Sequence, residues 1–447
     1  MKRVAFATLG CKLNQADTEA IRFAFERAGY ESVPFSKDVA ADVYVVNTCS
    51  VTGSTDHQCR QILRRAVAMK NANPGSVVVA TGCYSQVNPG EIESMVSGID
   101  IISGTLEKDR IPELVDEALK AGEGAPRRAV DDVFGQKKFR VMEIEGMAGR
   151  DRAFLRIQEG CDRRCSYCIV PIARGKERSA PMEAAVGMAT RLAANGYEEI
   201  VLTGVHIGRY GRGSEENKTL ADLLRALFDV SGIRRIRLGS IDPGEISPGF
   251  LAALKNGKDK ICGHFHVSLQ SGDDSILRMM RRSYTSDEYR RSVDLLREIF
   301  PEAAIGADVI VGFPGESDEN HLRTKALLES TRPSHLHIFR YSPREGTPAA
   351  KLPGQVSDEI KKRRARDLSA IKKRLGEEFR LRHVGERAEI LFESRRDPAT
   401  GRLTGLTRNY IRVFADGADE LKGRIAYGSL RSVFSDGMTA DDIRIDC

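Results

Sequence analysis

The sequence lacks the features of membrane-spanning and secreted proteins. No apolar run approaches the roughly 18 residues that a membrane-spanning helix needs. The N-terminal stretch "MKRVAFATLGCKLNQADTE" has two charges and only a short apolar run, so it predicts a first strand and not a signal peptide. We therefore expect a cytoplasmic protein with no membrane association. Because the cytoplasm is reducing, its nine cysteines predict metal binding or redox chemistry and not disulfides.

The sequence also lacks internal repeats of fixed period and low-complexity tracts, which indicates an ordinary globular chain. At about 100–200 residues per domain, its 447 residues predict two to four domains. Lys plus Arg number 69 and Asp plus Glu 63, so the net charge is +6. This mild excess is compatible with nucleic-acid binding but does not require it.

The first third of the chain alternates strand and helix patterns. Helical stretches are expected at Asp17–Gly29 and Ser54–Lys70, and a capping pair, Asn88 and Glu91, predicts the start of another helix. Near-continuous apolar strands separated by helices indicate a parallel sheet covered by helices, an N-terminal α/β domain over residues 1–120. The four strands expected here are Arg3–Leu9, Ala41–Asn47, Ser76–Gly82 and Ile99–Ser103.

The alternation resumes after a linker, residues 121–146, that is rich in Gly, Arg and Lys. Consecutive strand–helix units over residues 147–380 indicate a complete or partial (β/α) barrel, with a doubly wound open sheet as the alternative. The strands expected in this region are Phe154–Gln158, Glu199–Thr203, Arg235–Gly239, Phe265–Leu269, Ala307–Val311 and His335–Arg340.

The C-terminal part changes character twice. Asp358–His383 has apolar residues at helical spacing and predicts one long helix. Residues 381–447 then show short strand patterns separated by turn residues, which predict a small β-barrel.

Three cysteines share a position relative to the predicted strands. Cys11, Cys49 and Cys83 each come just past the C-terminal end of a strand, in "ATLGC", "VVNTC" and "VATGC". Such ends lie along one edge of a parallel sheet, where ligands bind. We therefore expect the three side chains to converge, although three unrelated buried cysteines would be the alternative.

A second set lies in "EGCDRRCSYCIVP", where Cys161, Cys165 and Cys168 follow the first strand of the central domain. A loop at this position opens on the active face of a barrel. Structural zinc sites have four protein ligands, and no fourth ligand is close in the sequence. Thiolates also hold iron–sulfur clusters, and a cubane held by three of them would keep one iron open.

The spacing C-x3-C-x2-C, with Tyr167 before the third cysteine, resembles the radical S-adenosylmethionine (SAM) superfamily. The resemblance implies a 4Fe-4S cluster on Cys161, Cys165 and Cys168, whose open iron binds SAM. It also implies that Tyr167 lies at the SAM site, with an ordinary half-buried loop position as the alternative.

Both cysteine sets together resemble the radical SAM methylthiotransferase family over essentially the whole chain. "TLGCKLNQADTE", "NTCSVTG" and "TGCYSQ" match the N-terminal domain of that family, and "GLTRNYIRV" is similar to a TRAM domain, a small RNA-binding barrel. The resemblance implies a partial (β/α) radical SAM barrel between these domains. It also implies an auxiliary 4Fe-4S cluster on Cys11, Cys49 and Cys83.

Within the family, "TLGCKLNQADTE", "LTGVHIGRYG" and "YSPREGTPAA" resemble the MtaB branch. That branch adds a methylthio group to C2 of N6-threonylcarbamoyladenosine beside the anticodon of tRNA. Sister branches act on isopentenyladenosine in tRNA or on an aspartate of a ribosomal protein. A non-catalytic iron–sulfur sensor that binds RNA is the alternative outside the enzymes.

The resemblance also implies the chemistry and its partners. SAM would be cleaved to a 5′-deoxyadenosyl radical that takes hydrogen from C2 of the adenine ring, and the auxiliary cluster would supply sulfur. A second SAM would supply the methyl group. The implied partners are tRNA, an electron donor such as flavodoxin or ferredoxin, and a sulfur source.

Other candidates rest on position alone. Four residues at predicted strand ends could bind SAM: Gly204, Ser240, Gln270 and Asp308. The alternative for each is a structural role in a turn or in the barrel interior. His206 is interpreted as a hydrogen-bonded structural histidine in preference to a catalytic acid. The remaining cysteines, Cys59, Cys262 and Cys447, are expected to be structural or incidental.

The expected RNA-binding residues lie near the C-terminus. The long helix carries Lys372, Lys373 and Arg374 among many basic residues and leads into the predicted barrel. Such a helix could follow tRNA phosphates, while a solvated helix face is the alternative. Tyr410 in the barrel could stack on a base or fill the core.

Overall fold

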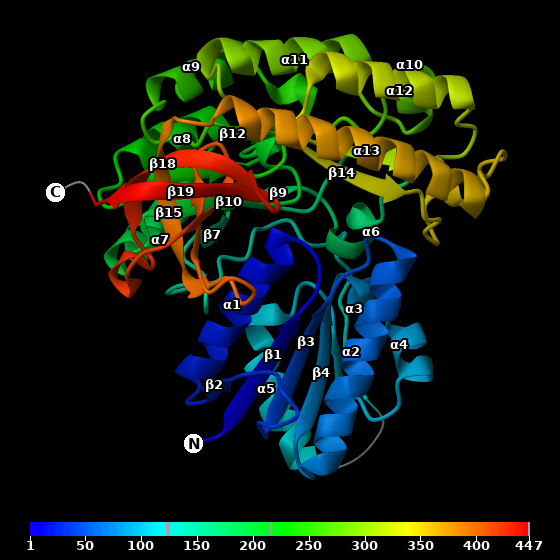
Figure 1. Cartoon of the computed structure of the whole chain (residues 1–447). Helices are drawn as coiled ribbons and strands as arrows, with labels where there is room; N and C mark the ends of the chain where they lie inside the picture. The colour runs from blue at the N-terminus through cyan, green and yellow to red at the C-terminus, as the bar shows by residue number, and fades with distance from the viewer. Residues whose placement is uncertain (122–125, 215, 446–447) are drawn as a thin grey trace.

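The computed structural model describes residues 1–121, 126–214 and 216–445, and it confirms the predicted fold class. An N-terminal parallel sheet, a central partial barrel and a C-terminal closed barrel follow one another along the chain (Figure 1). Within these ranges, we found no helix with both the length and the apolar character needed to cross a membrane.

The N-terminal sheet has six parallel strands in the order β2-β1-β3-β4-β5-β6. The two central strands, β3 and β4, are buried at every residue, which explains their continuous apolar pattern. The strands are β1 (Arg3–Thr8), β2 (Glu31–Val33), β3 (Val43–Thr48), β4 (Val77–Gly82), β5 (Ile101–Ser103) and β6 (Arg127–Ala129).

Helices cover both faces of this sheet (Figure 1). One apolar core joins the sheet to α1 and α5, and another joins it to α2, α3 and α4. Asn88 precedes α4 but makes no side-chain capping hydrogen bond, and Glu91 accepts a hydrogen bond from Arg60 of α2 at 2.9 Å. The helices are α1 (Lys12–Arg27), α2 (Gly53–Ala72), α3 (Cys83–Val87), α4 (Pro89–Met95), α5 (Ile111–Ala121) and a 3-10 turn, η1 (Lys108–Arg110).

Part of the predicted linker belongs to this sheet. The edge strand β6 lies within residues 121–146 and pairs with β5. Its sequence, "RRA", is short and half-exposed, so it has no apolar alternation that would indicate a strand. The domain boundaries at 120, 146 and 380 stay predictions.

The central domain has six parallel strands that neighbour one another in chain order. Two three-stranded groups are joined by the bridges Ile236–Ile261 and Ile241–Val267. A doubly wound sheet would reverse its strand order at one point, so the chain order identifies a partial barrel. The strands are β7 (Ala153–Arg156), β10 (Glu199–Thr203), β11 (Arg235–Leu238), β12 (His264–His266), β13 (Ala304–Val311) and β14 (His335–Arg340).

Helices follow these strands and pack outside them, and a single apolar cluster joins the two layers. A short pair, β8 (Gln158–Glu159) and β9 (Arg178–Ser179), flanks the cysteine loop. The helices are α6 (Val170–Arg174), α7 (Met182–Ala194), α8 (Leu220–Phe228), α9 (Pro248–Asn256), α10 (Asp274–Met279), α11 (Ser286–Ile299), α12 (Asp318–Thr331) and α13 (Asp358–Arg382).

The C-terminal barrel is closed, in the order β15-β16-β17-β19-β18, as expected for a TRAM-like domain. It lies against the central domain at the end of α13 (Figure 1). Its strands are β15 (Arg387–Arg396), β16 (Leu403–Thr407), β17 (Arg412–Ala415), β18 (Ile425–Phe434) and β19 (Gly437–Arg444). The other 3-10 turns are η2 (Ile207–Arg209), η3 (Pro243–Glu245), η4 (Pro348–Lys351) and η5 (Asp419–Leu421).

Candidate active site

Three cysteines meet at the carboxyl edge of the N-terminal sheet. Cys11, Cys49 and Cys83 follow β1, β3 and β4, which are neighbours in that sheet. Gly10 has a φ of +98°, and a Cβ at this residue would lie 2.6 Å from Cys49 Sγ. Glycine is therefore required where the first two cysteine segments touch.

The thiols of this set lie within electrostatic reach of one another. Burial raises the pKa of Cys49 to about 12, and negative charge on Cys83 and Cys11 adds to the shift. Arg174 Nε donates to Cys83 Sγ at 3.3 Å, so a buried cation lies beside this set. Three converging thiols suit an iron–sulfur cluster with an open iron better than a four-ligand structural zinc site.

The second set lies in the loop between β8 and α6. Arg282 Nη1 donates to Cys165 Sγ at 3.2 Å, and Cys161 Sγ lies 3.8 Å from His206 Nδ1. Burial raises the pKa of Cys168 to about 12, and the charges of Cys165 and Cys161 add to it. The three thiols lie within electrostatic reach of one another on a single loop, so this donor set likewise suits a cluster held by three cysteines.

His206 is hydrogen-bonded and buried beside this loop. Its Nε2 lies 2.5 Å from Glu245 Oε1 and 3.5 Å from Asp242 Oδ2. Burial lowers the pKa of His206, but hydrogen bonds to Cys161 and Glu245 and the nearby carboxylates outweigh it and raise the pKa to about 9. The positively charged ring fits the structural role expected for this histidine.

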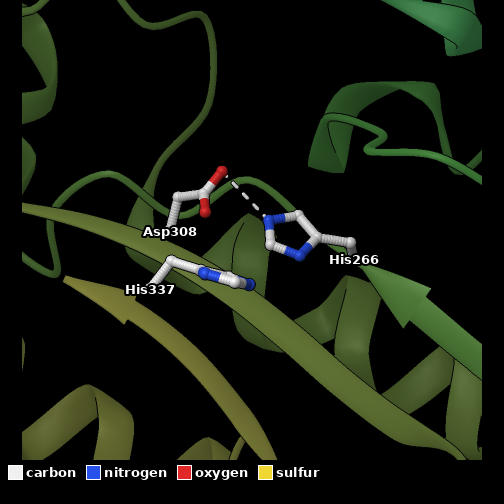
Figure 2. Close-up of side chains that lie close together, drawn as sticks. All are labelled: His266, Asp308 and His337. Carbon is white, nitrogen blue, oxygen red and sulfur yellow. Dashed lines mark ion pairs between the residues drawn. The ribbon is translucent and has the colours of Figure 1, made fainter. Parts of the chain in front are cut away.

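Asp308 lies inside the partial barrel between two histidines that the sequence analysis missed (Figure 2). Asp308 Oδ2 is 3.0 Å from His266 Nε2, and His337 offers a ring nitrogen to the same group of atoms, all within 4.8 Å. Burial raises the pKa of Asp308, but the hydrogen bond and the charges of both histidines outweigh it and lower the pKa. The repeats "HFH" and "HLH", at strand spacing, were a signal for both histidines.

The other predicted SAM-site residues take different positions. Tyr167 packs on the apolar cluster that contains Met280 and Phe313. Ser240 is exposed after β11, and Gln270 pairs with β13 through a hydrogen bond to Asp308 O. Their SAM-binding roles stay predictions.

Gly204 has a local reason to be glycine. A Cβ there would lie 2.7 Å from the main-chain oxygen of Gln158, on the segment that precedes the cysteine loop. This contact accounts for the residue without SAM, so its predicted role in SAM binding also stays a prediction.

Arg174 joins the segment that carries the second cysteine set to the N-terminal domain. It ends α6, which follows Cys168, and it reaches the N-terminal domain at Cys83. Its guanidinium also donates to Glu159 Oε1 at 2.8 Å and to Asp17 Oδ2 at 2.9 Å. The side chain is 2% exposed, so this contact is a buried bridge between domains.

The three domains meet around Tyr410. Its half-buried ring stacks on His264 at 4.4 Å between centroids, and Arg237 Cζ lies 4.9 Å from the ring centre. Lys12 Nζ, from α1, and Arg152 Cζ each lie 5.8 Å from the same centre. Burial raises the pKa of Tyr410, but the positive charges of Lys12, Arg152 and Arg237 outweigh it and lower the pKa.

The basic residues of α13 differ in their partners. Arg374 pairs with Glu329 at 2.5 Å and Glu378 at 3.0 Å. Lys372 and Lys373 are exposed, and no ion pair of the described residues includes either of them. The charge of Lys372 helps lower the pKa of His337, after burial as the larger cause, so Lys372 lies within electrostatic reach of His337.

The remaining cysteines lie apart from both sets or serve them indirectly. Cys59 Sγ donates to Cys49 O at 3.3 Å and so supports the loop that carries Cys49. Cys262 is fully buried in the central domain. Cys447 lies outside the described residues.

Known proteins share both parts of this arrangement. Residues 155–328 match the model of the radical SAM superfamily, and residues 3–104 match uncharacterized protein family UPF0004. A solved structure of the radical SAM methyltransferase TsrM from Kitasatospora setae, with cobalamin and a 4Fe-4S cluster bound, has a similar fold. Its TM-score is 0.57 at 17% identity, over 78% of this chain and 77% of that chain.

Two curated relatives extend the similarity to nearly the full length. The chain is 38% identical over 428 residues to threonylcarbamoyladenosine tRNA methylthiotransferase MtaB of Bacillus subtilis strain 168, covering 95% of this chain and 93% of that protein. It is 32% identical over 433 residues to tRNA-2-methylthio-N(6)-dimethylallyladenosine synthase of Pelotomaculum thermopropionicum, covering 95% and 94%. The chain belongs to the radical SAM tRNA methylthiotransferase family.

Proposed function

We propose that this protein adds a methylthio group to C2 of N6-threonylcarbamoyladenosine beside the anticodon in tRNA. The observation that carries the proposal is the presence of two three-cysteine sites, with Arg174, from the helix after the second site, bonded to Cys83 of the first. One site alone would suit many radical SAM enzymes, whereas sulfur insertion needs a second site close to the first. The relative named for threonylcarbamoyladenosine is more similar than the one named for dimethylallyladenosine, which favours this branch.

The residues present suit two 4Fe-4S clusters and SAM. Cys161, Cys165 and Cys168 would hold one cluster with SAM beside it, and the auxiliary set would hold the other. When bound, these groups supply the radical chemistry, the sulfur and the methyl group.

The side chains around the two sites hold the cysteine loops in place and would orient the target base. Arg282 and Arg174 donate hydrogen bonds to Cys165 and Cys83, and the buried Arg174 bridge fixes the N-terminal sheet edge against the barrel. His266, Asp308 and His337 line the interior where the target base would lie, with polar atoms that can hold it in one orientation.

The partners follow from this activity. The exposed lysines of α13 and the TRAM-like barrel suit the phosphates and bases of a tRNA. The reaction consumes electrons and sulfur, so we propose an electron donor such as flavodoxin or ferredoxin and a separate sulfur source. A tRNA substrate places the enzyme in the cytoplasm.

The test is mass spectrometry of tRNA nucleosides from cells with and without the gene. We expect the methylthio form of threonylcarbamoyladenosine to disappear with the gene and to return with the wild-type copy. Loss of only the isopentenyl-type product would contradict the proposed substrate. Unchanged methylthio nucleosides together with no 5′-deoxyadenosine from the reduced enzyme would favour the sensor alternative.

Cysteine variants connect the product to the two sites. Changing any one of Cys11, Cys49, Cys83, Cys161, Cys165 and Cys168 to Ala is expected to abolish the product in the complemented cells. Cys262→Ala is the matched control, because Cys262 is a buried cysteine outside both sets, and it should retain the product.

A further inference from the structure

Lys12 is a half-buried cation without an acidic partner. It follows Cys11 and opens α1, and no ion pair of the described residues includes it. Its Nζ lies 5.8 Å from the centre of the Tyr410 ring. An ammonium group kept partly from water without a carboxylate is costly, so such a group indicates an anionic ligand.

A second cation beside it also has an unused donor. Arg152 Nη1 is buried and has no hydrogen-bond partner among the described residues, and its nearest acid, Glu393, is 3.9 Å from Nη2. Arg237, the third cation at this ring, differs because it is neutralised by Glu199 at 2.8 Å. Lys12 and Arg152 are therefore the less compensated cations at this ring: no ion pair of the described residues includes Lys12, and the ion pair of Arg152 with Glu393 is long, at 3.9 Å.

The position of this charge is set by all three domains. Lys12 comes from the N-terminal domain beside Cys11, Arg152 precedes the first barrel strand, and Tyr410 comes from the C-terminal barrel. The charge of Lys12 also acts on His264 and His337 in the barrel. The cation pair therefore lies between the auxiliary cysteine set and the barrel interior.

The chemistry of the proposed substrate fits this position. In adenine, C2 and the N6 substituent flank N1 on the same edge of the ring. When C2 lies at the site that delivers sulfur, a group attached to N6 therefore lies close to the same site. The threonylcarbamoyl group has a carboxylate, whereas an isopentenyl group has no charge and would leave Lys12 unpaired.

We propose that Lys12, assisted by Arg152, binds the carboxylate of the threonylcarbamoyl group and so selects this nucleoside over uncharged N6-modified adenosines. This inference rests on the proposed function. A backbone phosphate of the same tRNA could supply an anion as well, and the experiment separates these two sources.

The test compares binding of two forms of one tRNA to the anaerobically purified enzyme with its clusters. One form carries threonylcarbamoyladenosine and the other carries plain adenosine at that position. We expect the wild type to prefer the modified form. Lys12→Gln should weaken binding of the modified form about 10- to 100-fold, the range of a charge-assisted hydrogen bond, and leave binding of the unmodified form within about twofold. Lys12→Arg should restore most of the preference.

Lys372→Gln is the matched control, because Lys372 is an exposed lysine on α13 with no ion pair among the described residues, which suits phosphate contact. It should weaken both forms equally. If Lys12→Gln also weakened both forms equally, Lys12 would be a phosphate contact and the inference would be wrong. Loss of iron from Lys12→Gln would mean a structural role and would overturn it too.

The two proposals fail separately. A wild type that makes the methylthio product and binds both tRNA forms equally would overturn the inference alone. A wild type that makes no methylthio product on threonylcarbamoyladenosine in cells would overturn the proposed function.

Discussion

At the residue scale, Arg174 connects the segment that carries the second cysteine set to the N-terminal domain. Its guanidinium contacts Cys83, Asp17 and Glu159, and every one of these groups is at least half-buried. Burial raises the pKa of Asp17, but the charges of Lys108, Arg174 and Arg156 outweigh it and lower the pKa. The cluster of charges is stable only as a complete set, since each acid depends on its cations.

We expect Arg174→Met to lower the free energy of unfolding by about 3–5 kcal/mol, because two buried carboxylates each lose a cation. Urea denaturation of the full chain, followed by far-UV circular dichroism, measures this change. Arg27→Met is the control, because Arg27 pairs with Glu143 on the surface at 3.3 Å and should contribute less than about 1 kcal/mol. Equal effects of the two variants would show that the buried bridge adds no stability.

The sequence predicted the cysteines better than their partners, for a physical reason. Cys11, Cys49 and Cys83 follow apolar strands, and parallel strands bring their ends to one edge whatever their separation in the chain. Arg174 meets Cys83 across 91 residues and Asp17 across 157, and no local pattern encodes such contacts.

At the element scale, elements with a clear local pattern were predicted correctly, and elements without one were not. The predicted helix Asp358–His383 agrees with α13 to within one residue, because apolar residues recur at helical spacing along all 25 residues of this helix. The three-residue strands β2 and β6 were missed because they are mostly polar and at least partly exposed at every residue, whereas β5, which is equally short, is mostly apolar and fully buried. Asn88 and Glu91 matched a capping sequence, yet Asn88 makes no side-chain capping hydrogen bond and Glu91 bonds Arg60 on another helix.

Helix α13 allows a prediction about tRNA binding. Lys372→Gln should weaken binding of tRNA at low salt. It should also reduce the magnitude of the slope of log affinity against log salt by about 1, the value for the loss of one phosphate contact. The reason is that Lys372 is exposed, has no acidic partner among the described residues and lies within electrostatic reach of His337. Affinity measured at four or more salt concentrations gives the slope.

Arg374→Gln is the control from the same helix. Its guanidinium is already paired with Glu329 and Glu378, so its removal should change the slope by less than that of Lys372. A larger effect for Arg374 than for Lys372 would show that these ion pairs open when tRNA binds and that the free-lysine argument is wrong.

At the scale of the whole molecule, buried arginines fix the C-terminal barrel to the central domain. Arg235 Nη1 donates to Leu406 O at 3.0 Å, and Arg237 Nη1 donates to Arg408 O at 3.0 Å. Both arginines contact Glu199, which lies on β10. Because Tyr410 lies in the loop held this way, the docking also sets the position of the cation pair formed by Lys12 and Arg152.

This docking should persist across the physiological pH range. Burial raises the pKa of Glu199, but Arg237, Arg152 and Arg235 outweigh it and lower the pKa to about 2. A carboxyl group with a lowered pKa stabilises the fold above its ordinary value near 4.5, and this contribution is lost only as the pH falls toward 2. Between pH 6 and pH 8 the contribution is therefore constant.

Arg235→Met should loosen the barrel without unfolding the central domain, because it removes the bonds to Glu389 and Leu406 while Arg237 still neutralises Glu199. Hydrogen exchange measured by mass spectrometry should become at least about tenfold faster in β15 and β16, since one lost charge-assisted hydrogen bond is worth that factor, and stay unchanged in β3 and β4. Arg225→Met is the matched control, because Arg225 is 48% exposed and pairs with Asp222 of its own helix at 2.9 Å. The ratio of variant to wild-type exchange should be the same at pH 6 and pH 8. Equal exchange rates in both variants would contradict the idea that Arg235 holds the C-terminal barrel against the central domain. A variant-to-wild-type exchange ratio that changed between pH 6 and pH 8 would contradict a constant negative charge on Glu199 in this range.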